Sequence, residues 1–222
     1  MTKLIADMSM SLDGYVARPD DDASRLHRWF FDGDTEVAPG APFMTSENSA
    51  QLLREALGSV GAIVGGRRYF DLADGWGGRH PMGVPVYILT HQPPADWPTD
   101  STIHFVTDGV MSAVAQAREA AGGRDIGVAT PDVIRQCLDA EVLDEIQINL
   151  IPVVLGQGRP LFDGIGQEVS LDGPEIVRGN GVIHLRYRVG ARGRDAQPSE
   201  ATARQVTHAG RGGELAEALN DD

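Results

Sequence analysis

The sequence predicts an α/β protein with a mixed, mostly parallel central sheet, and three observations support this prediction. Segments with strand character alternate with segments of helical spacing, which is typical of parallel sheets flanked by helices. Residues 146–155 are apolar enough for a strand buried on both faces over much of its length. Asn180 and Gly181 separate two later strands and favour an antiparallel hairpin, so we expect a mixed sheet.

Caps, turns and apolar spacing place the individual elements. Thr45 and Ser46 precede a helical run that Gly58 is expected to end, and Gly122-Gly123 end another. The predicted elements in chain order are a strand at 3–10, a helix at 45–57, strands at 61–64, 85–89 and 102–106, a helix at 110–121, a strand at 125–128, a helix from 131, a strand at 146–155, a short strand at 169–171, and hairpin strands at 175–178 and 182–189.

Length and composition predict one domain followed by a tail. The chain has 222 residues, which is enough for one sizeable hydrophobic core. We assign residues 1–190 to this domain. Residues 191–222 are rich in glycine, alanine and arginine and poor in large apolar residues, so we expect them to form a disordered tail.

Charge and hydropathy argue against several classes of protein. The formal net charge of −13 disfavours nucleic acid and anionic membranes as partners. No apolar run approaches the roughly 18 to 20 residues of a membrane span, and Asp7 interrupts the first apolar run, unlike a signal peptide. Cys137 is the single cysteine and sits at an apolar helix position, so we predict a cytoplasmic protein without an intrachain disulfide.

Two loops contain large aromatic residues. The acidic segment 19–42 contains Trp29-Phe30-Phe31, a triplet that either anchors the loop to the core or lines a cleft. Segment 74–83 is rich in glycine around Trp76, as expected of a mobile lid that closes over a substrate.

Residues 125–159 follow the plan of an α/β nucleotide site. A short strand leads into Thr130 as predicted helix N-cap, Pro131 at the first helical position and Asp132 in the first turn. The start of such a helix offers free N–H groups and a positive dipole to a phosphate. A buried strand then ends in a glycine turn that carries Arg159.

Arg67 and Arg68 form a second candidate for anion binding. They follow a strand and Gly65-Gly66 and begin a helix, where two cations oppose the helix dipole. A bound anion would remove this conflict. The alternative is a pair of solvated arginines on a surface helix.

Several motifs together resemble the dihydrofolate-reductase-like superfamily, in particular the reductase domain of riboflavin-biosynthesis deaminase–reductases and its stand-alone relatives. The motifs occur in the family's order over about residues 1–190 and lie at 11–15 (SLDGY), 66–68 (GRR), 86–91 (VYILTH), 142–145 (VLDE) and 151–162 (IPVVLGQGRPLF). The resemblance implies a three-layer α/β/α fold, NADPH as cofactor, hydride transfer to a C=N bond of a pteridine-like or pyrimidine substrate, and a homodimer formed through the C-terminal strands.

The resemblance also assigns roles to residues. Asp13 would be the catalytic carboxylate, as proton relay or substrate partner, although Asp-Gly is equally typical of a simple turn. Leu12 and Gly14 would contact the substrate, and Trp76 is expected to contact it from the predicted lid. The implied cofactor-binding residues are Gly66, Arg67, Arg68, Thr90, His91, Ala129, Thr130, Pro131, Asp132, Gly156, Gly158 and Arg159.

The sequence departs from the family pattern on the cofactor side. Ala129-Thr130 stand where the family usually has Gly-Gly, and Tyr69 stands where it commonly has Thr. Side chains at a phosphate-contacting turn hinder close approach, although the Thr130 hydroxyl could itself bind a phosphate oxygen. Either the cofactor sits slightly differently, or it binds weakly, or this member has lost reduction.

The sequence therefore predicts an NADPH-dependent reductase of a small heterocycle, with reduction of the ribosylaminopyrimidine intermediate of riboflavin synthesis as the named expectation. The alternatives are a reductase of an unrelated imine or carbonyl compound and a non-catalytic ligand-binding protein on the same fold. Asp144 and Glu145 are interpreted as structural. The six histidines show no metal-ligand spacing, so no metal is expected.

Overall fold

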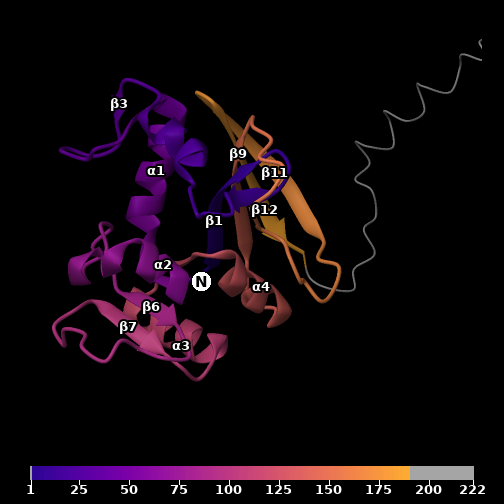
Figure 1. Cartoon of the computed structure of the whole chain (residues 1–222). Coiled ribbons are helices and arrows are strands. Elements are labelled where there is room, and N and C mark those ends of the chain that lie inside the picture. Colours follow the sequence, from indigo (N-terminus) through magenta and orange to yellow (C-terminus); the bar gives the residue numbers. More distant parts are fainter. Residues whose placement is uncertain (1, 191–222) are drawn as a thin grey trace, which may run out of the picture. The chain divides into compact units, whose positions relative to one another are not determined.

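The computed structural model describes residues 2–190, and an eight-stranded sheet runs through them (Figure 1). The strand order is β11-β12-β9-β1-β8-β5-β6-β7. The strands are β1 Leu4–Ser11, β5 Val60–Gly66, β6 Val86–Leu89, β7 Ile103–Val106, β8 Asp125–Val128, β9 Glu145–Ile151, β11 Leu171–Gly179 and β12 Val182–Val189.

The sheet is mixed as predicted. From β9 through β1, β8, β5 and β6 to β7, all neighbouring strands are parallel. The two C-terminal strands are antiparallel: β12 pairs with β9, and β11 pairs with β12 across the hairpin at Asn180-Gly181. The carboxyl ends of the parallel strands therefore lie along one edge of the sheet.

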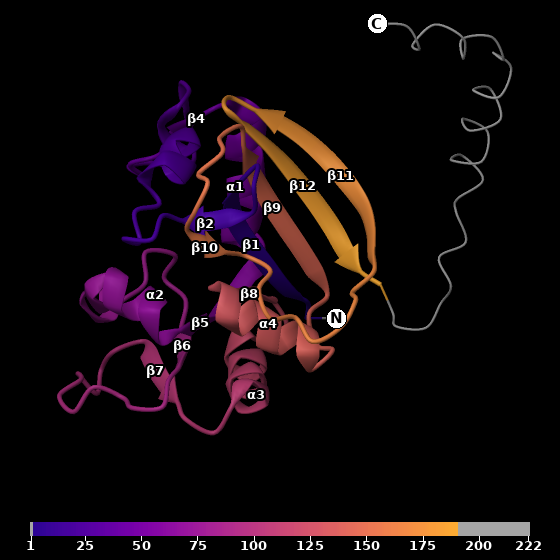
Figure 2. The ribbon, with the colours of Figure 1, turned by 45° about the vertical axis from the view of Figure 1, so that its right-hand side comes forward.

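Helices cover both faces of the sheet and give the expected three layers (Figure 2). Alternate residues of β5 show this, because Ala62 and Val64 pack with residues of α3 and α4, whereas Ile63 packs with Phe70 of α2 on the opposite face. The helices are α1 Glu47–Ser59, α2 Arg67–Leu72, α3 Val110–Ala121 and α4 Pro131–Asp139.

Several boundaries differ from the predictions. Helix α1 continues past Gly58, which was expected to end it, and strand β9 ends at Ile151 rather than at residue 155. The strand predicted at 175–178 is part of the longer strand β11, which begins at Leu171 and so contains only the last residue of the strand predicted at 169–171. The pairing of β11 is irregular between Asp172 and Glu175. The short elements are β2 Tyr15–Ala17, β3 Thr35–Glu36, β4 Met44–Thr45, β10 Arg159–Pro160 and the 3-10 helices η1 Ser24–Phe31 and η2 Asp74–Gly78.

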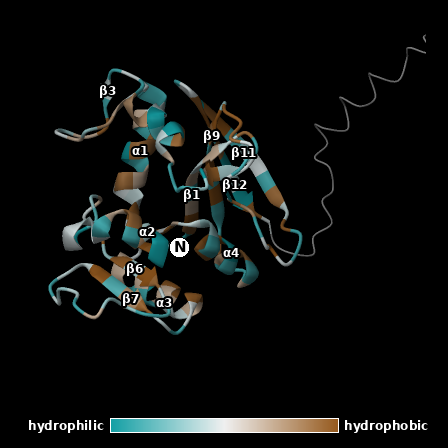
Figure 3. Ribbon diagram, in the orientation of Figure 1, coloured by the Kyte–Doolittle hydropathy of each residue, from teal (hydrophilic) through white to brown (hydrophobic). Residues whose placement is uncertain are grey.

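One face of β9 is polar although it is buried. The prediction that β9 is buried on both faces is confirmed, but Glu145, Gln147 and Asn149 occupy its second face. Figure 3 shows hydrophilic residues within this part of the sheet. Asp144 and Glu145 are structural as expected, because Asp144 accepts a hydrogen bond from the backbone N–H of Leu4 and Glu145 pairs with Lys3.

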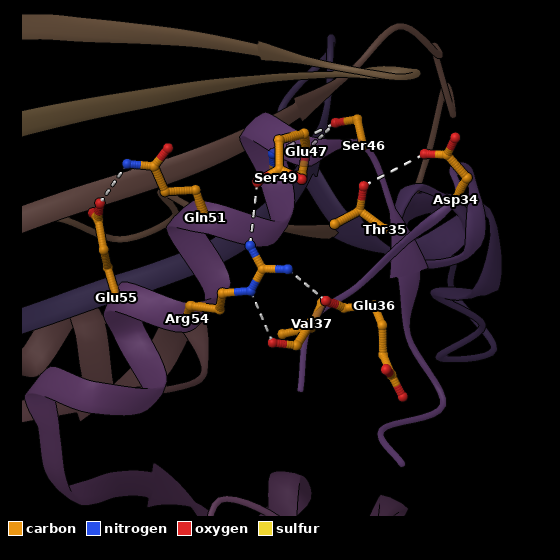
Figure 4. A network of polar contacts seen from close by, with 10 residues as sticks. All are labelled: Asp34, Thr35, Glu36, Val37, Ser46, Glu47, Ser49, Gln51, Arg54 and Glu55. Carbon is orange, nitrogen blue, oxygen red and sulfur yellow. Dashed lines mark hydrogen bonds and ion pairs between the residues drawn. The ribbon is translucent and has the colours of Figure 1, made fainter. Parts of the chain in front are cut away.

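Helix α1 holds the segment before it in place (Figure 4). The Arg54 guanidinium donates to the carbonyl oxygens of Glu36 at 2.6 Å and Val37 at 3.1 Å, and it pairs with Glu47 at 3.3 Å. The Ser46 hydroxyl accepts from the backbone N–H of Ser49 and so caps the helix, as the sequence predicts.

The predicted disordered tail, residues 191–222, lies outside the described residues. Within residues 2–190, no helix is both long and apolar enough to cross a membrane.

Candidate functional site

A cavity of about 1740 Å³ opens where the parallel strands end. Its lining includes Gly66 at the end of β5, Thr90 after β6, Thr107 after β7 and Ala129 after β8. The carboxyl ends of parallel strands are the usual ligand site of open α/β sheets. The volume exceeds the roughly 300 to 1,000 Å³ of a single-ligand pocket, so the cavity is large enough for a cofactor and a substrate together.

Most residues predicted to bind the cofactor meet in this cavity. They come from the start of α2, the ends of β6 and β8, the start of α4, and β10. The predicted residues that line the cavity are Gly66, Arg67, Arg68, Thr90, His91, Ala129, Thr130, Pro131, Asp132, Gly158 and Arg159.

The start of α4 differs in one respect from the prediction. Pro131 occupies the first helical position as expected, but the Thr130 side chain makes no capping hydrogen bond. The Thr130 hydroxyl instead lies against Gly66, where a Cβ atom on Gly66 would come within 2.9 Å of it. It is buried and has no hydrogen-bond partner in the described part of the chain. The first-turn amides of α4 are therefore not capped by this hydroxyl.

Thr130 also has an unusual backbone conformation. Its φ of +81° lies in a region that side-chain-bearing residues, and β-branched ones above all, rarely adopt. Glycine tolerates this conformation without strain. The geometry explains why glycine is favourable at position 130 and why Thr130 is a costly replacement; the backbone of Ala129 shows no such conformation.

The two arginines of α2 face the cavity but already have protein partners. Arg67 pairs with Asp71 at 2.7 Å and donates to the carbonyl oxygen of Gln92 at 2.6 Å. Arg68 donates to Asp21 at 2.8 Å, and Arg159 of β10 contacts the same carboxylate. Because all three guanidinium groups remain partly exposed along the cavity, they can still meet an anionic ligand.

Asp13 lies outside the cavity lining and forms a turn. Its carboxylate accepts hydrogen bonds from the Ser11 hydroxyl at 2.7 Å and from the backbone N–H groups of Leu155 at 3.0 Å and Gly156 at 2.7 Å. These bonds, that of Ser11 foremost, lower the pKa of Asp13 to about 2. Of the two roles considered for Asp13, this geometry favours the structural one.

The other predicted substrate residues, Leu12, Gly14 and Trp76, are not among the residues that line the cavity. Gly156, which was predicted to bind the cofactor, is also absent from the lining. The lid expected around Trp76 is the short turn η2, in which Gly75, Trp76 and Gly77 all have positive φ values. The Trp76 ring packs edge-on against Tyr69 at 4.7 Å and His80 at 4.8 Å.

Tyr69, which stands in place of the family's Thr, does line the cavity. Its hydroxyl bonds the His80 ring at 3.0 Å. Burial raises the pKa of Tyr69 to about 12 and lowers that of His80 to about 4, so both side chains are neutral near pH 7.

The sequence analysis missed Asp7, a carboxylate of the cavity itself. Asp7 is open to the cavity and surrounded by protein on its other sides, and this desolvation raises its pKa to about 6 despite the Asn149 hydrogen bond and the charge of Arg186. The sequence carried a signal, because Asp7, Ser9 and Ser11 are polar at alternate positions and so lie on one face of β1.

The aromatic triplet fulfils both roles considered for it. Trp29 is buried, and its indole N–H donates to the Ser9 hydroxyl at 3.0 Å, so it anchors the loop to β1. Trp29 and Phe30 stack with ring centroids 4.0 Å apart, and both line the cavity. Phe31 points outward and is 61% exposed.

The described residues contain no group of three or more His, Cys, Asp or Glu side chains arranged to hold a metal ion. Cys137 is buried on α4, where desolvation raises the pKa of its thiol to about 12. A thiol that stays protonated at neutral pH is a poor nucleophile, so Cys137 belongs to the core.

The sheet order, the layers and the position of the cavity define a dihydrofolate-reductase-like α/β protein. Solved structures share this fold. A putative riboflavin biosynthesis protein from Shewanella sp. PV-4 has a TM-score of 0.65 and 21% identity, covering 86% of this chain and 100% of that one. A dihydrofolate reductase from Enterococcus faecalis, complexed with NADP(H), has a TM-score of 0.54 and 14% identity, covering 85% of this chain and 97% of that one.

The chain belongs to the RibD C-terminal domain family, whose pattern matches residues 2–185. This confirms the resemblance seen in the sequence motifs. One relative is the uncharacterized protein YwjB of Bacillus subtilis (strain 168). It is 24% identical over 169 residues, which cover 76% of this chain and 87% of YwjB.

Proposed function

We propose that this protein is an NADPH-dependent oxidoreductase that reduces a small pteridine-like or pyrimidine compound. The single observation that carries the proposal is the convergence of Arg67, Arg68 and the start of α4 on one large cavity at the carboxyl ends of parallel strands. Family membership supports a reductase, and the named expectation remains a substrate of the riboflavin-pathway type.

The residues present fit a phosphorylated dinucleotide. The first turn of α4 presents amides that the Thr130 hydroxyl does not cap, and a helix start attracts a pyrophosphate. The buried Thr130 hydroxyl beside them lacks a partner among the described residues, as expected of a group that a ligand completes. Arg67 and Arg68, with Thr90 and His91 close by in the lining, would hold the 2′-phosphate that distinguishes NADPH from NADH.

The cofactor would supply the reducing chemistry when bound: a hydride carries two electrons to the carbon of a C=N bond, the nitrogen takes up a proton, and the nicotinamide leaves oxidised. The protein's part is to hold the substrate, exclude water and provide the proton. We assign Asp7, a carboxylate of the cavity lining, to holding the substrate by hydrogen bonds, in place of Asp13.

A non-catalytic ligand-binding protein is the second candidate, and two observations favour it. Thr130 is strained at the position where a phosphate would approach. Asp21 contacts both Arg68 and Arg159 and so competes with an anionic ligand.

Titration of the purified protein with NADPH and with NADH, followed by nicotinamide fluorescence or calorimetry, separates the two candidates. We expect saturable NADPH binding below millimolar concentration. Arg67→Ala and Arg68→Ala should each weaken NADPH binding at least about tenfold, because a charge-assisted hydrogen bond contributes roughly 1.5 to 3 kcal/mol. NADH, which has no 2′-phosphate, should respond much less to either substitution.

Arg118→Ala is the matched control, since Arg118 is exposed on α3 and lies outside the cavity lining. Absence of binding by either nucleotide at millimolar concentration would remove the reductase proposal and leave the ligand-binding protein. If Arg67→Ala and Arg68→Ala lose affinity for NADH and NADPH equally, the 2′-phosphate does not bind at these arginines.

A further inference from the structure

Asp7 is a cavity carboxylate held by amides and by no cation. Its Oδ1 accepts from Asn149 Nδ2 at 2.6 Å, and its Oδ2 accepts from Gln147 Nε2 at 3.1 Å. Arg186 donates to the Gln147 side-chain oxygen at 3.2 Å and 3.4 Å instead of reaching Asp7. Within the described residues no ion pair includes Asp7.

A buried chain of hydrogen bonds fixes the orientation of Asn149. Because Asn149 Nδ2 donates to Asp7, its Oδ1 must accept the 2.7 Å hydrogen bond from His184 Nδ1. Burial lowers the pKa of His184 to about 4, so the ring is neutral and its Nε2 accepts from the Ser49 hydroxyl at 2.8 Å. Ser49 in turn accepts from Ser46, the capping residue shown in Figure 4.

The direction of this chain has a consequence for Asp7. Every bond from Ser46 to Asn149 has its donor on the side away from Asp7, so the chain ends in N–H groups that favour the ionised carboxylate. A carboxylate has about four acceptor positions, and the protein uses two of them. Since Asp7 lines the cavity, the remaining positions are available to a ligand.

Apart from Arg186, whose charge acts on Asp7 without forming an ion pair, the groups around Asp7 are uncharged or aromatic. Ser9 lies on the same face of β1 and binds the Trp29 indole, which stacks on Phe30. Trp29 also meets the His184 ring edge-on at 5.0 Å. The lining arginines belong to α2, α4 and β10, and none of the contacts of Asp7 described above comes from these elements.

We propose that Asp7 forms a subsite for a flat nitrogen base, in which the carboxylate receives two N–H donors of a cationic or amidine-like group in the cavity that the stacked Trp29 and Phe30 also line. Two parallel N–H donors match the geometry of a carboxylate, as in arginine–carboxylate pairs. A phosphate would be repelled here by the negative charge of Asp7, which no ion pair among the described residues neutralises. The nitrogen-bearing end of the ligand therefore occupies the Asp7 subsite, and any anionic group of the ligand lies elsewhere.

That this ligand is the substrate rests on the function proposed above, but the subsite itself can be tested without the cofactor. Benzamidine, benzamide and benzoate are similar in shape and carry a positive, no and a negative charge at neutral pH. Their binding to the full chain at pH 7.5 is measured by ligand-observed NMR and by the change in tryptophan fluorescence. We expect benzamidine to bind more tightly than benzamide and benzoate to bind least.

Asp7→Asn nearly preserves the shape of the side chain and removes its charge. It should weaken benzamidine about tenfold, as expected for the loss of a charge-assisted hydrogen-bonded pair, and leave benzamide within about twofold. Asp163→Asn is the matched control, because Asp163 is another carboxylate of the cavity lining and should leave benzamidine binding unchanged.

Three outcomes would overturn the subsite: benzoate binding to the wild-type chain as well as benzamidine, unchanged benzamidine affinity in Asp7→Asn, or an equal loss in Asp163→Asn. The first measurement needs no variant, so poor folding of a variant cannot obscure it. NADPH titration of the same samples separates this inference from the proposed function, because benzamidine binding at Asp7 does not depend on whether NADPH binds.

Discussion

Asp7 shows at the scale of one residue how a functional group opposes stability. Amide donors and the charge of Arg186 favour its ionised form, but desolvation dominates and raises the pKa from 3.8 to about 6. A carboxylate whose pKa is raised by folding binds its proton more tightly in the folded state. The free energy of unfolding therefore decreases as pH rises between about 4 and 6. Above pH 6 the ionised carboxylate keeps it at this lower value.

Asp7→Asn should therefore stabilise the protein at pH 8 and have a smaller effect at pH 4. A shift of about two pKa units corresponds to about 3 kcal/mol. Because the carboxylate is open to the cavity and partly solvated, we expect about 1 kcal/mol in the free energy of unfolding. Urea unfolding of both proteins at the two pH values measures the difference.

Asp96→Asn is the matched control for this measurement, since Asp96 is exposed and lies outside the cavity lining. A variant that is less stable than the wild type at pH 8 would show that the hydrogen bonds of Asp7 outweigh its desolvation.

At the scale of elements, Asp21 connects parts of the chain that are far apart in sequence. It lies after β2 and contacts Arg68 of α2 and Arg159 of β10, so it joins both sides of the cavity. Its side chain is only 13% exposed. A carboxylate between two arginines occupies the kind of position that a phosphate oxygen would take.

Asp21→Asn should therefore strengthen NADPH binding. Removal of a competing, partly exposed ion pair is expected to release about 1 kcal/mol, which is about fivefold in affinity. The titration described for Arg68→Ala measures it, and Asp20→Asn at an exposed neighbouring position is the control. Weaker binding in Asp21→Asn would mean that Asp21 aligns the two arginines for the phosphate and does not compete with it.

At the scale of the whole molecule, β11 forms one of the two edges of the sheet, and no strand among residues 2–190 pairs with its outer side. Strand β11 is the last strand on its side, and most of its residues are exposed. Ile176 of β11 is 59% exposed, and Ile183 of β12, a diagonal neighbour on the same face, is 38% exposed. A long exposed edge with apolar residues is usually covered or paired.

We propose that this edge pairs with a second copy of the chain, as the predicted homodimer requires. Light scattering coupled to size-exclusion chromatography should give the mass of two chains for the wild type and of one chain for Ile176→Lys, because a buried lysine without a partner opposes association. Met111→Lys on α3 is the control, since Met111 is similarly exposed at 52%. A wild-type protein with the mass of one chain would contradict the proposal.

How much could be predicted from the sequence depended on how local the signal was. Helix α3, strand β8 and strand β12 have the predicted bounds, because glycine stops and apolar spacing act within a few residues. The sequence also indicated that Arg67 and Arg68 lie with the other strand-end residues, and both line the cavity, since strand ends meet at one edge of a parallel sheet. The predicted side-chain cap by Thr130 was wrong, because the Thr130 hydroxyl packs against Gly66 at the end of β5 and makes no capping hydrogen bond.

The predicted substrate residues show what the sequence alone left open. Asp13 and Trp76 have residue types that suggest chemistry, yet the Asp13 carboxylate accepts hydrogen bonds from Ser11 and from the distant Leu155 and Gly156, and the Trp76 ring packs against Tyr69 of α2 and His80. Asp7 stands in an ordinary strand, and only the pairing of β1 with β9 and of β9 with β12 brings Gln147, Asn149 and His184 to it.

The sequence by itself determined the fold class, the family and most of the motif residues that meet at the cavity, because these follow from local periodicity and from motifs read along the chain. Only the tertiary structure decided which carboxylate faces the cavity, what its pKa is and which arginines are already paired. Desolvation and hydrogen bonding depend on residues that are distant along the chain and adjacent in space, and a one-dimensional pattern does not specify those neighbours.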